Sequence, residues 1–255
     1  MADPLVVESI RQAVLSELDG TPYACSALFP LAGGYANFVF RGVLKEKLAN
    51  GASEVAIKHG QDHAATDPNM LVTTYRCVCP SLTPYTVPAG PGVLTLTKRL
   101  EKECLVATAS LHAVGDAGYA LRTPHLYYFN EESNTQVQEY VPNTVDLKMF
   151  ALGQSAPESE YLAIGRAVGK WLHNLHEWGQ LPAQSTFREY LGADTCMQSL
   201  KNVINYGWLI DRINDYPAAL SDARAVFEDV QKMANAELAD PSRHRIIHGD
   251  FWTGK

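Results

Sequence analysis

The first sixty residues change from a helical to an alternating pattern of apolar positions. Apolar side chains recur every three or four residues from Pro4 to Leu18, where Asp3 can cap a helix and Asp19-Gly20 can end it. Runs of β-branched and aromatic residues then predict three strands, over residues 23–31, 38–44 and 54–59. The short turns between these strands indicate an antiparallel meander.

The pattern becomes irregular after this meander. Residues 60–98 are rich in proline and have no sustained period, so we expect an irregular insertion there. A helical pattern follows over residues 99–114. Two more strands are predicted over residues 126–129 and 137–141, split by a polar turn at 130–134. For this first part of the chain we therefore predict a small antiparallel sheet with attached helices.

After Pro142 the apolar positions take the spacing of helices. The predicted helices cover residues 161–178, 197–213 and 221–238. In the last of them Ser221 is the expected N-cap, and we expect three apolar side chains to face inward: Val226, Val230 and Met233. We therefore predict an α+β fold in two parts, residues 1–141 and 142–255.

Composition narrows the class of partner. The chain has 255 residues, 46% of them apolar, and a formal net charge of −7. A general nucleic-acid-binding protein needs a basic surface, so we expect no nucleic-acid partner. No apolar run approaches the ~20 residues of a membrane-spanning helix, so we expect no membrane partner. Five cysteines, an odd number, indicate a reduced cytoplasmic protein. The oligomeric state is not readable from the sequence.

The sharpest chemical motif is His248-Gly249-Asp250, which follows an apolar run. The glycine allows a tight turn. A carboxylate held there can accept the proton of a substrate hydroxyl, the general-base role of phosphoryl transfer. We take Asp250 and His248 as candidate catalytic residues, although these three residues alone also fit an ordinary turn.

A lysine ends the third predicted strand, in Val55-Ala56-Ile57-Lys58. Its ammonium can pair with the phosphates of ATP if a helix carboxylate orients it. Glu101 and Glu103 are both candidates for that carboxylate. Because they are two positions apart they lie on different helix faces, so only one can point at Lys58, and we favour Glu103. A solvated lysine at a strand end is the alternative.

Two backbone segments complete a candidate nucleotide site. A small-residue turn between the first two strands contains Gly33, Gly34 and Asn37, and its N–H groups can cap phosphates. A plain glycine hairpin is the alternative. The segment Gln138–Val141, which includes Glu139, leads from the first part into the second. Its N–H and C=O groups can bind the edge of a purine ring.

In this order the motifs resemble the aminoglycoside phosphotransferase/choline kinase-like family. The stretch from His248 to Gly254 is similar to the family's H-G-D-x-x-x-x-N catalytic loop, and Leu172–His176 resembles its helix ending in Leu-His. The resemblance extends over residues 23–255. It implies a protein-kinase-like bilobal fold, with an antiparallel-sheet N-lobe and a helical C-lobe, and it implies ATP and Mg²⁺ as cofactors.

The resemblance also implies a role for each candidate residue. Asp250 matches the catalytic base and Lys58 the phosphate-pairing lysine, with Glu103 or Glu101 as its ion-pair partner. The turn at 33–37 matches the phosphate-covering loop, and Gln138–Val141 matches the adenine-binding linker. The implied reaction is ATP-dependent phosphoryl transfer to a hydroxyl of a small molecule, which the sequence does not name.

The sequence departs from the family at the metal site. Lys255 stands where the family has a metal-binding Asn, and an ammonium has no lone pair with which to bind Mg²⁺. The family's second metal-binding Asp and its closing helices have no counterpart. We therefore expect an incomplete helical lobe, in a fragment or a truncated product of doubtful activity. The alternatives are a non-catalytic nucleotide-binding or regulatory protein and a plain α+β interaction domain.

Overall fold

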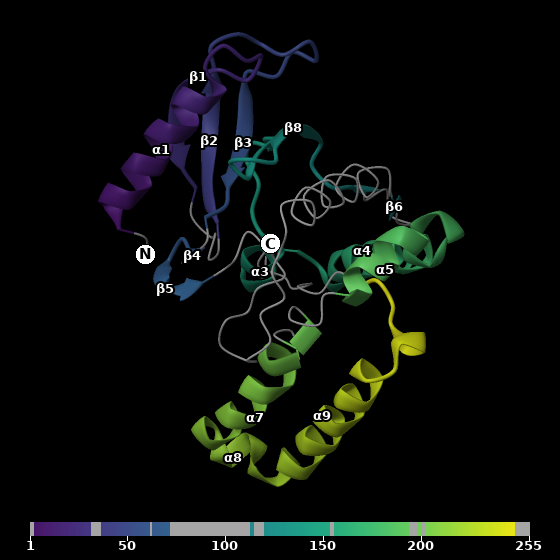
Figure 1. Ribbon diagram of the computed structural model, residues 1–255. Coiled ribbons are helices and arrows are strands. Elements are labelled where there is room, and N and C mark those ends of the chain that lie inside the picture. The colour runs from purple at the N-terminus through teal and green to yellow at the C-terminus, as the bar shows by residue number, and fades with distance from the viewer. Residues whose placement is uncertain are drawn as a thin grey trace. The chain divides into compact units, whose positions relative to one another are not determined.

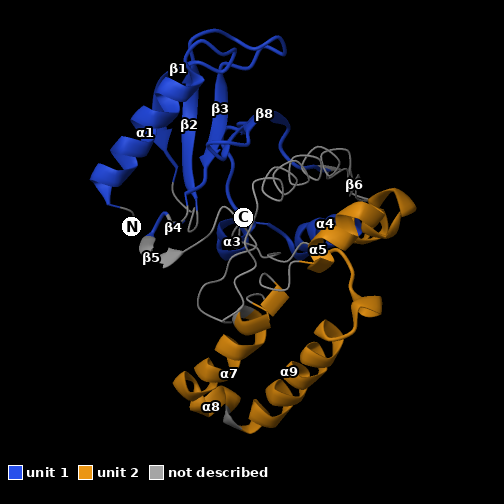
Figure 2. Ribbon diagram, in the orientation of Figure 1, with its two compact units in different colours: residues 1–75, 88–171, 252–255 blue, residues 76–87, 172–251 orange. Residues whose placement is uncertain are grey.

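The computed structural model describes residues 3–31, 37–61, 63–71, 113–114, 120–153, 156–193, 198–199 and 202–247 (Figure 1). They divide into two compact units: the described residues up to Trp171 form the sheet unit, and those from Leu172 onward form the helical unit (Figure 2). The described residues contain both α-helices and a five-stranded antiparallel sheet, which confirms the α+β class. None of the described helices is long and apolar enough to cross a membrane. The boundary at 141/142 stays a prediction.

Helix α1 (Pro4–Leu18) begins and ends where the sequence predicts. Asp3 caps it, because its side chain accepts a hydrogen bond of 2.9 Å from the Leu5 amide. Pro4 suits the first turn, since its missing N–H would have no partner there. Val14 and Leu18 are fully buried in the core against the sheet.

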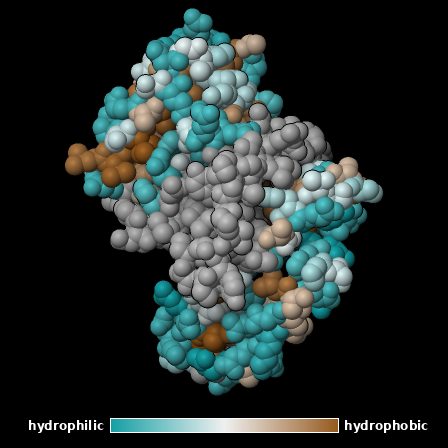
Figure 3. Space-filling model, in the orientation of Figure 1, coloured by the Kyte–Doolittle hydropathy of each residue, from teal (hydrophilic) through white to brown (hydrophobic). Residues whose placement is uncertain are grey.

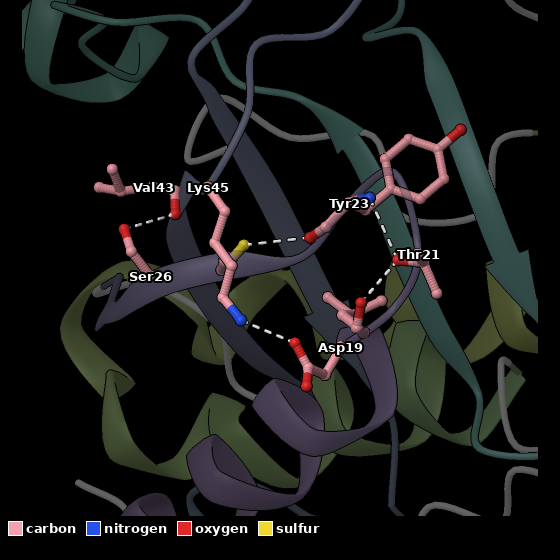
Figure 4. Close-up of polar contacts among 8 residues, drawn as sticks. Asp19, Thr21, Tyr23, Ser26, Val43 and Lys45 are labelled. Atoms are coloured by element: carbon pink, nitrogen blue, oxygen red, sulfur yellow. Dashed lines mark hydrogen bonds and ion pairs between the residues drawn. The ribbon is translucent and has the colours of Figure 1, made fainter.

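The corner between α1 and the first strand is held by short-range polar contacts (Figure 4). The Thr21 hydroxyl donates to the Leu18 carbonyl at 2.7 Å and accepts from the Tyr23 amide at 3.1 Å. Lys45 forms an ion pair of 2.7 Å with Asp19, but both side chains are more than half exposed. Because exposed ion pairs stabilise little, Thr21 is the main polar contact of this corner.

The sheet has the strands β1 (Cys25–Pro30), β2 (Phe38–Leu44), β3 (Glu54–His59), β8 (Leu126–Asn130) and β9 (Thr135–Glu139). Their order is β1-β2-β3-β9-β8, and every neighbouring pair is antiparallel. The predicted meander of the first three strands is confirmed. Since β9 lies between β3 and β8, the chain after the insertion re-enters the sheet at its β8 edge and then turns back to place β9 beside β3.

Burial alternates strictly along β2 and β3. Phe38 and Phe40 of β2 and Val55 and Ile57 of β3 are buried in the core with α1. An alternating pattern is what a sheet with one covered face requires. The intervening residues therefore lie on the opposite face, and one of them is Lys58.

Three details of the sheet unit correct the prediction. β9 covers Thr135–Glu139 rather than 137–141, so the whole strand lies two residues earlier than predicted. Its pairing with β8 already starts at Thr135, directly after the turn. Within the expected irregular insertion, β4 (His63–Ala64) and β5 (Asp67–Leu71) form a hairpin. The end of the predicted helix 99–114 is wrong, since β6 (Ala113–Val114) pairs with β7 (Ala120–Leu121). Residues 99–112 lie outside the described residues.

The helices after the sheet are α3 (Leu147–Leu152), α4 (Glu158–Gln180), α5 (Ser185–Ala193), α7 (Trp208–Arg212), α8 (Pro217–Leu220) and α9 (Arg224–Leu238). One π-helical segment, η2 (Val203–Gly207), and four 3₁₀ turns are also described: η1 (Pro182–Gln184), η3 (Ile213–Asp215), η4 (Ser221–Ala223) and η5 (Pro241–Arg243). α4 contains the predicted helix 161–178, and it buries Trp171 and Leu175.

Two helix predictions are corrected. The described part of 197–213 is not one regular helix, because it passes from η2 through α7 into η3. Gly207 lies at the first of these changes, and glycine is a poor helix former. Ser221 lies in η4 and does not cap α9. The residue before α9 is Ala223, whose side chain has no capping group.

The apolar stripe of α9 is exposed, so the expected inward orientation is wrong. Val226, Val230 and Met233 are 62, 42 and 66% exposed. α9 contacts its neighbours through its other side, where Arg224 donates to Asn214 at 2.9 Å. The helical period of the stripe was correct, but the side that the helix buries was not.

Figure 3 shows other places where apolar side chains reach the surface. Hydrophobic surface lies over the start of α1, where Leu5 is 80% exposed, and over α7, where Leu209 is exposed. Hydrophilic side chains border both patches in this view.

Candidate functional site

Lys58 lies near the end of β3, on the face of the sheet opposite the core. Its sequence neighbours Ile57 and His59 are buried, whereas Lys58 is half-buried. In register it lies opposite Val39 of β2 and Gln136 of β9. Directly opposite residues in an antiparallel pair share a face, so Lys58 extends from between two ordered strands.

This face of the sheet, which we call the open face, carries both polar and apolar side chains. The strand registers place twelve residues on it, of which Phe129 and Gln136 are buried: Ala27, Phe29, Val39, Arg41, Val43, Glu54, Ala56, Lys58, Leu126, Phe129, Gln136 and Gln138. The Arg41 guanidinium stacks on the Phe29 ring at 4.9 Å, and the Gln138 amide donates to Gln136 at 2.9 Å. An apolar floor with a few placed polar groups is typical of small-molecule sites.

Three residues from separate segments meet at the end of the sheet nearest Lys58. A methyl group on Gly60 would lie 2.2 Å from Asn134 Nδ2 and 3.2 Å from Asn37 Oδ1, so only glycine fits without movement. The Gly60 amide donates to the Asn134 carbonyl at 3.1 Å. Asn134 has a φ of 57°, which asparagine tolerates better than most residues. We call Asn37, Gly60 and Asn134 the edge cluster.

A buried chain of hydrogen bonds lies behind the edge cluster, on the core face. His59 Nδ1 and the Thr135 hydroxyl are 2.9 Å apart, and that hydroxyl donates to Glu17 of α1 at 2.8 Å. Burial lowers the pKa of His59, and the negative charge of Glu17 opposes this effect. The imidazole is therefore neutral at neutral pH.

Glu139 has its carboxylate committed to other residues of the sheet unit. Arg122 donates two hydrogen bonds to it, one of them 2.6 Å long, and the His125 amide donates a third at 3.2 Å. The bonds from Arg122 are the main reason why the pKa of Glu139 is lowered. Glu139 also donates its own amide to the His125 carbonyl at 2.8 Å. Its side chain thus fastens the end of β9.

The described residues contain four of the predicted site residues. Asn37 and Lys58 come to the same end of the sheet. Glu139 lies at the other end of β9, three residues and about 10 Å beyond Gln136, the residue opposite Lys58. Val141 follows the strand, and its carbonyl accepts from Thr144 at 3.2 Å. The other predicted site residues lie outside the described residues: His248, Asp250, Gly33, Gly34, Glu101 and Glu103.

Sequence reasoning missed Glu17, Thr135 and Gly60. Glu17 and Thr135 are 118 positions apart, and nothing local in either segment indicates their contact. Gly60 gave a weak signal, since a glycine directly after a strand is consistent with a close backbone approach.

Among the described residues, no group of three or more His, Cys, Asp and Glu side chains could hold a metal ion. A surface hollow of about 260 Å³ is lined by Trp208, Asp211 and Arg212 in the helical unit. None of the four described site residues lines this hollow.

The architecture defines an α+β protein in which an antiparallel sheet is followed by helices. No family model matches the sequence. The chain is similar to the phosphotransferase FrzJ of Cladobotryum sp., with 26% identity over 255 residues that cover 97% of this chain and 63% of the relative. The chain thus spans less than two thirds of that relative's length.

Proposed function

We propose that this chain carries the nucleotide-binding part of a phosphotransferase that moves the γ-phosphoryl group of ATP to a hydroxyl of a small molecule. In this proposal residues 1–141 form the N-lobe and residues 142–255 the helical C-lobe of a protein-kinase-like fold. The similarity to a relative named a phosphotransferase supports the reaction class. The order of the five strands and the place of Lys58 on β3 support the assignment of the sheet to an N-lobe.

One observation carries the proposal: Lys58 extends from an ordered inner strand onto the open face, at the end of the sheet that also holds Asn37. An ammonium at such a position can neutralise the α- and β-phosphates without having to be reoriented on binding. The small-residue turn that ends at Asn37 would then cover the phosphates, with Gly33 and Gly34 letting the backbone approach.

The other roles follow from the chemistry of the residues. Glu103, or Glu101, would orient Lys58. Since the Glu139 side chain is held by Arg122, the segment from Glu139 to Val141 would present backbone groups, not a carboxylate, to adenine.

In the reaction the acceptor oxygen forms a bond to the γ-phosphorus, the bond from that phosphorus to the β–γ bridging oxygen breaks, and ADP leaves. Asp250, with His248 beside it in the loop, would accept the hydroxyl proton. Mg²⁺ would neutralise phosphate charge. The described residues offer no set of ligands for this ion.

The test is transfer of label from [γ-³²P]ATP to hydroxyl compounds. The compounds come from the classes that the aminoglycoside phosphotransferase/choline kinase-like family uses, such as aminoglycosides, choline and sugars. Lys58→Met should lower kcat/KM for ATP by about 100-fold or more, because transition-state charge loses its partner. Asp250→Asn should lower kcat by about 10²–10⁴-fold. The matched control is Lys45→Met, which removes an exposed ion pair directly after β2 and should leave both constants unchanged.

Two results would contradict the proposal. If wild-type protein binds ATP but transfers no phosphate to any acceptor or to water, the protein is a nucleotide-binding protein without catalysis. If Lys58→Met and Lys45→Met have equal effects, Lys58 has no special role.

A further inference from the structure

The turn between β8 and β9 is tied to α1 by a cluster of hydrogen bonds around one carboxylate. Glu17, in the last turn of α1, accepts from Asn130 Nδ2 at 2.7 Å, from the Ser133 hydroxyl at 2.7 Å and from the Thr135 hydroxyl at 2.8 Å. All three donors lie in or beside the turn, and more than 110 residues separate each from Glu17. The carboxylate therefore fixes the turn as a whole, since no single strand holds all three donors.

The number of protons on the Thr135 hydroxyl gives the direction of its hydrogen bond with His59. A threonine hydroxyl has one proton, and Thr135 uses it on Glu17. Toward His59 the hydroxyl must therefore accept, so the neutral imidazole carries its proton on Nδ1. Its Nε2 is then left with a lone pair, which accepts from the Gln61 amide. One continuous chain of donors thus leads from Gln61 through His59 and Thr135 to Glu17.

Two consecutive residues at the end of the turn hold the chain directly after Lys58. Thr135 holds His59, the next residue, through its side chain. Asn134 holds Gly60 through its carbonyl at 3.1 Å, and its amide packs over the Gly60 Cα, where the Asn37 side chain also approaches. The position of Lys58 along its strand and the position of Asn37 thus depend on the same turn.

We propose that the β8–β9 turn, anchored on Glu17, is a positioning element that sets Lys58 and Asn37 at the distance a triphosphate requires. This inference rests on the proposed function and adds to it. Thr135 and Glu17 act through His59, and Asn134 acts through Gly60, so none of them is a catalytic residue. The element works on the phosphate end of the nucleotide, because the adenine end is assigned to the far end of β9.

The experiment compares ATP with adenosine as ligands of the full chain in the presence of Mg²⁺. ATP binding is measured by isothermal titration and adenosine binding by ligand-observed NMR. Thr135→Val keeps the shape of the side chain but removes the contacts of its hydroxyl with His59, Glu17 and Ser133. We expect it to weaken ATP binding by about 10- to 100-fold, as small displacements of positioned groups do, and to leave adenosine binding unchanged. Thr135→Ser, which keeps the hydroxyl, should restore most of the ATP affinity.

The matched control is Thr21→Val, which removes a half-buried hydroxyl at the same end of α1 that bonds only to neighbouring residues. It should leave the affinity for both ligands unchanged. Gly60→Ala is the second test, because it displaces the edge cluster while leaving the hydroxyl chain intact. We expect the same selective loss of ATP affinity from it.

Each outcome separates this inference from the proposed function. A wild-type protein that binds no ATP overturns the proposed function, and the inference with it. If wild-type protein binds ATP but Thr135→Val weakens ATP and adenosine equally, or weakens neither, the turn has only a structural role and the inference alone is wrong. Where Thr135→Val does not fold, Gly60→Ala decides in the same way.

Discussion

The sheet unit and the helical unit bury their apolar residues differently. In the sheet unit, α1 and strands β1, β2, β3 and β9 share one continuous buried core. In the described part of the helical unit, the buried large apolar side chains are Leu175, Ile213 and Ile246, while the apolar stripe of α9 is exposed. The described core of the sheet unit is therefore continuous, whereas in the described part of the helical unit the apolar stripe of α9 is left uncovered.

The largest expected effect comes from emptying the core of the sheet unit. Phe40 is fully buried in the middle of β2. Phe40→Ala should lower the free energy of unfolding by about 3–5 kcal/mol, because it removes a buried ring and leaves a cavity. Urea denaturation followed by circular dichroism measures this loss.

Phe29→Ala is the matched control for that substitution. Phe29 lies on the neighbouring strand β1, but it is on the open face, 47% exposed and stacked by Arg41. We expect it to cost only about 0.5–1 kcal/mol, the value of an exposed cation–π contact. Equal losses for the two variants would contradict the assignment of one covered and one open face.

The same difference between the units explains which elements the sequence predicts. The helix over 4–18 and the strands at 38–44 and 54–59 match their observed bounds, because their caps, turns and alternation are local. The side of α9 that is buried depends on which helices surround it, and no local pattern contains that information. For the same reason the stripe that begins at Val226 was placed on the wrong side.

The residues of the candidate site also divide into those that local sequence features predict and those that only the fold brings together. The sequence predicts Lys58 and Asn37, because a strand end and a turn are local features. It does not predict Glu17 or Thr135, since their roles exist only when segments more than 100 residues apart meet. Likewise, the partner of Glu139 follows from the fold that brings Arg122 to the end of β9.

Two glycines give a second comparison, because one lies inside the core of the sheet unit and the other meets no neighbouring atoms. A methyl group on Gly42 of β2 would lie 2.7 Å from Cys25 Sγ and 2.9 Å from Ile57 Cδ1, inside the core. Gly42→Ala should therefore destabilise the protein by about 1–3 kcal/mol through overpacking. Gly192→Ala in α5 meets nothing within 4 Å, and it should stabilise by up to about 1 kcal/mol because alanine is the better helix former. Thermal denaturation of both variants tests the contrast, and a loss at Gly192 would contradict it.

The buried histidine of the sheet unit predicts a smaller, pH-dependent effect. Burial lowers the pKa of His59 in the folded state, while in the unfolded chain it keeps its ordinary value near 6.5. Below pH 6.5 the unfolded chain therefore binds a proton that the folded protein does not, so this contribution to stability is complete above pH 6.5 and is lost as the pH falls.

Urea midpoints at pH 7.5 and pH 5.5 measure this contribution. His59→Gln should reduce the difference between the two midpoints, because it removes the titrating group. A difference that His59→Gln leaves unchanged would assign the acid sensitivity to other groups.

The smallest expected effect is on the exposed stripe of α9. Met233→Gln and Val230→Thr exchange apolar for polar side chains that are already in contact with water, so each should change the free energy of unfolding by no more than about 0.5 kcal/mol. Ile213→Thr is the matched buried control, at 1% exposure, and should cost at least about 1 kcal/mol because it places a hydroxyl in the core. The same urea titration serves for all three variants. If the α9 variants lose as much stability as Ile213→Thr, their stripe is covered in solution, and the contrast between the two units is smaller than the described residues indicate.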